Sequence, residues 1–260
     1  MEIPDARLGS AAPGTHLLQF YSDDLSQLAR NVSKYFIDGF DAGCTAMLVA
    51  TKEHQRAILD DLKDREYSPE ALQREGLLHV FDAEQTLQRI IVGGWPDPER
   101  FESIAVNAVR DAASRMPGAG VCAFGEMVGL LWERKQYPAA IRLEQMWNNF
   151  QTRERISLYC AYPVDLLGCD FEAGIVDPLL CAHTQVVPND RASRMHTAID
   201  QAMREVLDCA ERRLMTQSRG RKAWATLPPA EAAILWLHKY APERADDVIA
   251  RARRYYEAVS

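Results

Sequence analysis

The sequence has no apolar run long enough to cross a bilayer and no signal for secretion. A membrane-spanning helix needs about 18 or more apolar residues, and no stretch of the 260-residue chain approaches that length. Residues 1–14 are polar and rich in Ala, Pro and Gly, without the basic segment and apolar core of a signal peptide. We therefore expect a soluble, cytoplasmic protein with no membrane partner, in which residues 1–14 form a flexible leader.

Paired cysteine spacings and an excess of positive charge are also missing. The six cysteines are scattered without a CxxC pair, and most lie in apolar segments where a free thiol behaves as a small hydrophobe. The 37 acidic residues outnumber the 30 basic ones, which gives a net charge of −7. Such a chain has no general attraction for nucleic acid or anionic membranes. We predict a reducing compartment and no direct nucleic-acid partner.

The chain does contain a regular alternation of short apolar runs and longer amphipathic segments. This alternation predicts βαβ units and a mostly parallel sheet covered by helices on both faces, hence an α/β three-layer sandwich. The predicted strands are His16–Tyr21, Thr45–Thr51, Leu77–Asp82, Gly120–Glu126 and Ile156–Tyr162. The predicted helices are Asp24–Gly39, Glu53–Arg65, Ala83–Gly94, Asp97–Arg115, Met127–Trp132 and Pro138–Thr152.

The last third of the chain differs from the body. From Pro163 to Asp190 several prolines and glycines interrupt the pattern, which fits an edge strand or a loop. From Arg191 onward the pattern is helical, with predicted helices Arg191–Arg219, Pro228–Tyr240 and Pro242–Val259. The sequence therefore predicts three parts: the leader 1–14, an α/β domain 15–190 and a helical C-terminal extension 191–260.

The segment Phe20–Gln27 stands where an ATPase would carry its phosphate loop. The helix, glycine-containing turn and strand that follow it resemble RecA-like ATPases of the KaiC type. Those enzymes need a GxxxxGK[ST] loop, whose backbone N–H groups and lysine hold the phosphates. Here the loop has no glycine and no lysine, and Asp23 and Asp24 would repel a triphosphate. We interpret these two acids as helix N-terminal groups, and the fold as RecA/KaiC-like without a phosphate loop.

Glu126 ends the fourth predicted strand, in the run Phe-Gly-Glu-Met. Ligands of open α/β sheets collect beyond the carboxyl ends of the strands, so Glu126 stands where recognition would occur. Alternatively, Glu126 has a structural role and caps the following helix. The sequence leaves the binding role and the capping role open.

Several motifs together resemble the MEDS family of sensory domains, named for methanogens, methylotrophs and the regulator DcmR. They include HLLQFY at 16–21, FGEMV at 124–128, LEQMWN at 143–148 and CAYP at 160–163. The resemblance covers residues 15 to 190. It implies a KaiC-like core without ATPase residues that senses small, hydrocarbon-derived molecules in transcriptional or two-component regulation. The sequence shows no helix-turn-helix or kinase module, so a regulatory protein partner is expected to supply the output.

Our leading hypothesis is a non-catalytic sensor with a mainly apolar pocket at the strand ends. A pair such as Trp132 and Trp147 is more often core than ligand cage, and nothing in the sequence brings Glu126 and Glu144 together as catalytic carboxylates. The predicted ligand-binding residues are His16, Phe20, Tyr21, Glu126, Trp132, Glu144, Trp147, Asn148 and Tyr162.

A metal or thiol site is the alternative that cysteine and histidine raise. Cys160, Cys181 and His183, with His16 or His54, offer ligand types that zinc accepts, but their spacing matches no metal motif. We predict no cofactor and no metal. A Cys160–His183 nucleophilic pair would require the fold to bring them together, and the default for Cys160 is a packed core thiol.

Two other functions remain open. One is a divergent enzyme, either a nucleotide hydrolase or a thiol or metal enzyme. The other is an interaction scaffold that forms a homodimer or docks a partner through Pro228–Val259.

Overall fold

A computed structural model of the chain describes residues 12–22, 25–114, 118, 120–168, 171, 173–188, 192–218 and 227–258. Asp23 and Asp24, nearly all of the predicted leader and the Arg219–Lys222 turn lie outside these residues. The chain divides into two compact units. One comprises the described part of Met1–Pro163 together with Ala182–Val187, and the other Val164–Cys181 together with the described part of Pro188–Ser260. No helix in the described ranges is long and apolar enough to cross a membrane.

The first unit is built on a six-stranded sheet whose strands all run parallel. Its order is β3-β2-β6-β7-β1-β8. The strands are β1 (His16–Tyr21), β2 (Thr45–Ala50), β3 (Leu78–Asp82), β6 (Val121–Gly125), β7 (Ile156–Pro163) and β8 (Gln185–Val186). The five strands expected from the sequence are present with ends shifted by at most one residue, and β8 is the edge strand expected between Pro163 and Asp190. The predicted α/β class is confirmed.

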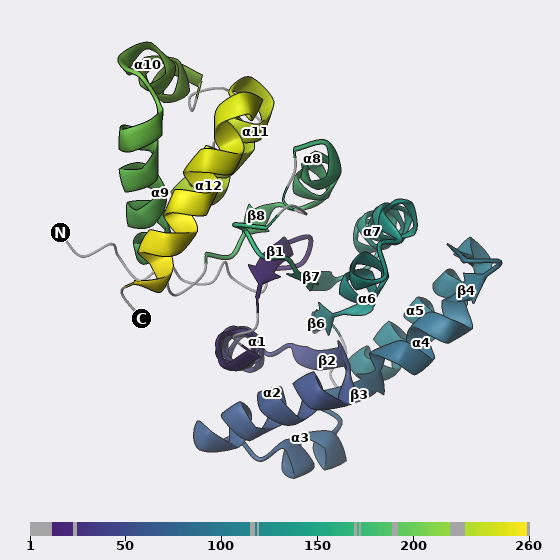
Figure 1. Cartoon of the computed structure of the whole chain (residues 1–260). Coiled ribbons are helices and arrows are strands. Elements are labelled where there is room, and N and C mark those ends of the chain that lie inside the picture. The colour runs from purple at the N-terminus through teal and green to yellow at the C-terminus, as the bar shows by residue number, and fades with distance from the viewer. Residues whose placement is uncertain are drawn as a thin grey trace. The chain divides into compact units, whose positions relative to one another are not determined.

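Helices cover both faces of this sheet, which makes the three layers (Figure 1). Helices α1 (Leu25–Asp41) and α2 (Lys52–Asp64) pack on one face, and α3 (Pro69–Glu75) lies beside β3. The other face carries α4 (Ala83–Ile90), α5 (Pro98–Ala113), α6 (Met127–Glu133) and α7 (Tyr137–Gln151). The interior strand β2 is buried along its whole length, which explains its continuous apolar sequence.

Local chemistry fixes where these helices start. Thr51, Ser68, Asp82 and Asp97 each accept a hydrogen bond from the backbone N–H three residues ahead. Such caps satisfy donors that the first helical turn leaves without a partner.

Three features differ from the sequence prediction. The helix expected over Ala83–Gly94 ends at Ile90, because Gly93 and Gly94 adopt positive φ angles of 57° and 84°. They turn the chain into an antiparallel hairpin of β4 (Ile91–Val92) and β5 (Trp95–Pro96). The short helix α3 was not predicted. Between Pro163 and Asp190, where an edge strand or a loop was expected, the structure also contains the helix α8 (Ala173–Ala182).

The described part of the second unit that follows Pro188 is helical, but the helix expected over Arg191–Arg219 is split in two. Helices α9 (Ala192–Val206) and α10 (Cys209–Ser218) replace the single helix expected over Arg191–Arg219. Asp208 causes the break, because its carboxylate accepts the N–H groups of Ala210 and Glu211 at 2.7 and 2.9 Å. Its own N–H donates to the Glu211 carboxylate at 2.8 Å, which completes a capping box.

Helices α11 (Pro229–Tyr240) and α12 (Pro242–Glu257) complete this unit, and both pack on α9. Glu231, in the first turn of α11, is only 3% exposed. Burial raises the pKa of its carboxyl from 4.5 to about 7, against the opposing effect of a backbone hydrogen bond. The folded chain therefore binds more protons at this group than the unfolded chain between these two values.

We predict that Glu231→Gln stabilises the protein at pH 8 by about 3 kcal/mol, and by less than about 1 kcal/mol at pH 5. Stability is lost as the pH rises from 4.5, where the unfolded chain ionises, to about 7, where the folded chain ionises as well, by about 1.4 kcal/mol per unit of pKa shift. Urea unfolding at the two pH values measures the change. Glu243→Gln, at an exposed position in the first turn of α12, is the control. A Glu231→Gln variant with the same pH dependence as the wild type would contradict the prediction.

Candidate functional site

The carboxyl ends of β2 and β6 form the topological switch point of the sheet. From β2 the chain passes through α2 and α3 to β3, whereas from β6 it passes through α6 and α7 to β7 in the opposite direction. Ligand sites of open α/β sheets lie at such points. Glu126 follows β6 here, as the sequence predicts, and Thr51 follows β2.

Glu126 uses its carboxylate to join these two strand ends. It is 2% exposed, accepts the Thr51 N–H at 2.8 Å and pairs with the His54 ring at Nδ1. Burial by itself lowers the pKa of His54, but the hydrogen bond and negative charge of Glu126 outweigh it and raise that pKa above 6.5. Glu126 makes no side-chain cap to α6, so it secures the start of α2 rather than the helix that follows it.

Glu126→Gln should lower the free energy of unfolding by about 2 kcal/mol at pH 6, since it removes a hydrogen bond between charged groups. The raised pKa of His54 gives stability that is complete below pH 6.5 and is lost as the pH rises through the folded pKa. The effect should therefore shrink at pH 9. Urea unfolding at both pH values tests this, with the exposed Glu75→Gln as control. An equal loss at the two pH values would exclude the charged pair.

A second polar group is buried between the sheet and α7. We name the side chains of His16, Glu144, Cys160 and His183 the His–Glu–Cys cluster. One ligand atom from each lies within 4.8 Å of every other. His16 comes from β1 and Cys160 from the neighbouring strand β7. Glu144 comes from α7, and His183 from the segment that leads into β8.

Short contacts connect the members of the cluster. His16 Nε2 lies 3.2 Å from Cys160 Sγ and 3.4 Å from Glu144 Oε2. His183 Nε2 lies 3.4 Å from Glu144 Oε1, and Cys160 Sγ lies 3.8 Å from Glu144 Oε2. The two imidazole rings have their centroids 4.0 Å apart. All four side chains are therefore within reach of a single central atom.

Two further residues support the cluster from outside. His16 Nδ1 lies 3.0 Å from Asn148 Oδ1, and the same oxygen accepts the Gln151 Nε2–H at 3.0 Å. Because that oxygen is an acceptor, Nδ1 of His16 carries the proton and Nε2 presents its lone pair to the cluster. The Tyr162 hydroxyl donates to Glu144 Oε1.

Burial and mutual contact set the protonation of these groups. Burial, with the charge of His183, lowers the pKa of His16 to about 4. Burial by itself raises the pKa of Glu144, but His183 and His16 lower it to about 2, assisted by the Tyr162 hydrogen bond. Burial and then the Glu144 charge raise the pKa of Cys160 well above its usual value. The cluster thus holds a carboxylate next to a neutral imidazole and a protonated thiol.

The structure brings together part of the cysteine and histidine set that the sequence singles out. Cys160, His183 and His16 meet in the cluster. Cys181 is exposed and is not a member, and His54 pairs with Glu126 instead. Cys160 is only 3% exposed, so its sulfur is not presented to solvent as a nucleophile.

The aromatic residues predicted to bind ligand pack against one another near the strand ends. The Tyr162 ring lies 5.3 Å from the Trp132 ring and 6.4 Å from the Phe20 ring, centroid to centroid. All three side chains are buried. The Tyr21 ring meets the His54 ring edge-on at 5.8 Å. The ligand-binding role of these residues stays a prediction.

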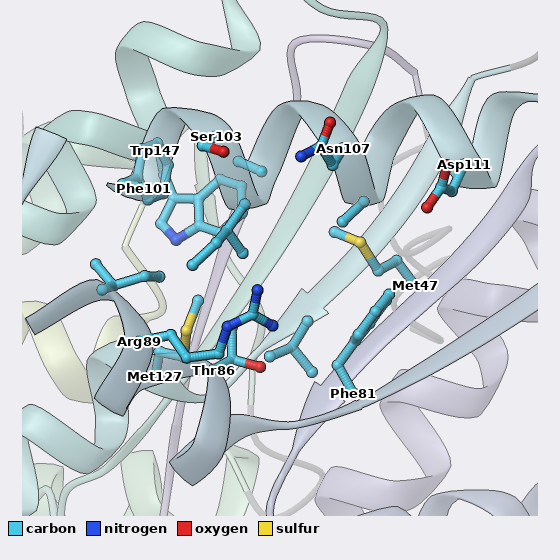
Figure 2. A pocket seen from close by; sticks show the side chains of 15 residues that line it. Met47, Phe81, Thr86, Arg89, Phe101, Ser103, Asn107, Asp111, Met127 and Trp147 are labelled. Atoms are coloured by element: carbon cyan, nitrogen blue, oxygen red, sulfur yellow. The ribbon is translucent and has the colours of Figure 1, made fainter. Parts of the chain in front are cut away.

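A mainly apolar pocket lies elsewhere, between α4, α5 and the sheet (Figure 2). This pocket has a volume of about 240 Å³. Its floor is formed by buried apolar side chains that include Met47, Val49, Met127 and Trp147. Of the predicted ligand residues, Trp147 alone lines it, and its ring packs on Phe101 at 4.8 Å.

The rim of the pocket is polar and exposed. Ser103, Asn107 and Asp111 follow one another along α5, and Arg89 reaches from α4 toward the space between the helices (Figure 2). Within the described part of the chain, the Arg89 guanidinium has no hydrogen-bond or ion-pair partner. Sequence reasoning missed this pocket, because the small residues Ala105 and Ala108 that leave the space look like ordinary helix positions.

Comparison with known families gives one finding. The model of the "MEthanogen/methylotroph, DcmR Sensory domain" matches residues 15–184, which is more than half of the chain. No curated protein matches the chain significantly. The matched segment contains the parallel sheet, the His54–Glu126 pair, the His–Glu–Cys cluster and the apolar pocket. The chain therefore belongs to the MEDS family of sensory domains.

Proposed function

We propose that this domain senses a small organic molecule in the pocket between α4 and α5 and passes its state to a regulatory protein partner. The observation that carries the proposal is the pocket of about 240 Å³ with an apolar floor and a polar rim. An apolar cavity of about 150 Å³ is enough to hold benzene. The pocket therefore has room for a small organic molecule, and most binding sites for such molecules share this arrangement.

Arg89 indicates the chemical class of the ligand. Its guanidinium stands at the rim, free of partners among the described residues, and a planar guanidinium matches a carboxylate. Burying an apolar body against Met47, Met127 and Trp147 would supply the remaining affinity. We expect a ligand with an apolar body and an anionic or acceptor group.

The same proposal treats the fold as an ATPase-like framework without nucleotide chemistry. The segment Phe20–Gln27 has neither glycine nor lysine, so it cannot form the loop that holds a triphosphate. ATP should give no thermal stabilisation. Substantial ATP hydrolysis that Glu126→Gln abolishes would favour the enzyme alternative.

Thermal unfolding with small probes tests the proposal. Benzoate and toluene at millimolar concentration should both raise the melting temperature. Ala108→Phe, which fills the pocket, should abolish both shifts. Arg110→Phe, which places the same ring on an exposed position of α5 outside the pocket, should preserve them.

Arg89→Met separates the two parts of the site. Benzoate affinity should fall about tenfold, the loss of one charge-assisted hydrogen bond, while toluene affinity is unchanged. Arg110→Met is the matched control. If neither probe stabilises the wild type, or if Ala108→Phe leaves both shifts intact, the pocket is not the sensing site.

A further inference from the structure

The His–Glu–Cys cluster combines the side chains that bind zinc-like ions, and it is built in the interior of the domain. Imidazole nitrogen, thiolate sulfur and carboxylate oxygen are the usual protein ligands of zinc. The ligand atoms come from four separate places in the chain, at positions 16, 144, 160 and 183, and they converge within 4.8 Å of one another. We propose that this cluster binds one transition-metal ion of the zinc class.

The spacing of the ligand atoms fits a four-coordinate ion. Zinc bonds of about 2.0–2.3 Å place neighbouring tetrahedral ligands about 3.3–3.8 Å apart. Four separations in the cluster are 3.2, 3.4, 3.4 and 3.8 Å, of which those from His16 and Cys160 to Glu144 are to Oε2 and that from His183 is to Oε1. Only small movements of these side chains are needed to place each atom at bonding distance from a common centre.

The surroundings of the cluster provide the outer contacts typical of metal sites. Histidine ligands usually donate their second ring N–H to an oxygen, which fixes the tautomer. Asn148 Oδ1 accepts from His16 Nδ1 in this way, 3.0 Å away, and is itself held by Gln151. Tyr162 donates to Glu144, which orients the carboxylate. His16 therefore directs the nitrogen lone pair inward, as a ligand must.

Charge balance also favours an ion of charge +2. Metal binding would displace the Cys160 proton to solvent. The resulting thiolate and the Glu144 carboxylate carry two negative charges between them, and two neutral imidazoles add none, so the complete site would be neutral. Burying an unbalanced charge is costly, and Glu144 is only 1% exposed. In a purely hydrogen-bonded cluster Cys160 would contribute only a weak S–H donor. Metal binding gives the sulfur a strong interaction instead.

The proposed ion would tie together parts of the fold that are distant in sequence. It would link β1, β7, α7 and the segment leading into β8. Four protein ligands leave no open position, which is the pattern of structural rather than catalytic zinc. Metal binding should therefore contribute to the stability of the first unit.

Cobalt titration of the full chain, purified without a histidine tag and freed of metal with a chelator, tests the proposal. Co²⁺ should bind with one ion per chain and give the visible absorption of tetrahedral cobalt, together with a near-ultraviolet band from thiolate coordination. Zn²⁺ should displace it. Cys160→Ser should remove the thiolate band. Cys122→Ala, a buried thiol on neighbouring strand β6 outside the cluster, should leave it unchanged.

A positioning variant and an unmodified sample keep the test decisive if Cys160→Ser fails to fold. Asn148→Ala should weaken Zn²⁺ affinity by about 10- to 100-fold, as loss of an outer contact does, without losing the thiolate band. Wild-type protein should melt at a higher temperature with Zn²⁺ than with chelator. A folded wild type that binds no Co²⁺, or a thiolate band that survives Cys160→Ser, would overturn the proposal and leave a hydrogen-bonded polar core.

Discussion

Replacing Glu144 by alanine should cost about 3–5 kcal/mol of stability in the presence of chelator. The change removes the carboxylate that Tyr162, His16 and His183 contact inside the domain. Removing one partner from a buried ionic group leaves the others without compensation, which is among the most destabilising single changes. Urea unfolding measures the loss. The expected loss of stability does not depend on whether the cluster binds a metal, because the chelator removes any contribution of metal binding.

Two further variants on α7 serve as comparisons for Glu144→Ala. Gln145→Ala, at an exposed position beside Glu144, should change stability by less than about 0.5 kcal/mol. Glu144→Gln keeps an acceptor for the Tyr162 hydroxyl and should fall between the two. Wild-type stability in Glu144→Ala would mean that the buried polar contacts contribute nothing to the folded state.

The second large effect is expected at Gly129, in the middle of α6. A Cβ atom there would lie 2.6 Å from the backbone oxygen of Ala161 and 3.3 Å from the Pro163 ring. Neither atom belongs to a flexible side chain, so α6 would have to move away from β7. Overpacking of this kind typically costs about 1–3 kcal/mol, and the helix preference of alanine offsets less than about 1 kcal/mol. We predict a net loss of about 2 kcal/mol for Gly129→Ala.

Gly125→Ala is the matched control. A Cβ at Gly125, at the end of β6, would meet no atom within 4 Å. It should therefore change stability only slightly. Equal melting temperatures for the two variants would show that the close approach of α6 to β7 is not required.

The sequence was sufficient to predict the sheet because its strands are short apolar runs bounded by polar residues. β2 is buried from Thr45 to Ala50, and its apolar sequence ends where α2 begins. The strands β4 and β5 and the helix α3 were not predicted, because a two-residue strand or a seven-residue helix is too short to show a periodic pattern. Asp208 falls inside the predicted helix Arg191–Arg219, but its side chain accepts backbone N–H groups and separates α9 from α10.

The candidate site was predictable as a set of residues but not as an arrangement. The motifs single out His16, Glu144 and Cys160 separately, yet only the parallel pairing of β1 with β7 places His16 near Cys160. His183 joins them through an edge strand of two residues, which no local pattern reveals. The pocket was missed for a different reason: it arises from small side chains on α5 facing the sheet, and a space left between elements has no sequence signature.

Methyl NMR of methionine-labelled protein tests the central claim most directly, namely that the domain binds small organic molecules between α4 and α5. Met47 and Met127 line the pocket, whereas Met195 and Met203 are buried in the second unit. Titration with benzoate should shift the methyl signals of Met47 and Met127 in a saturable way and leave those of Met195 and Met203 in place. Unchanged Met47 and Met127 signals at saturating benzoate and toluene would contradict the account.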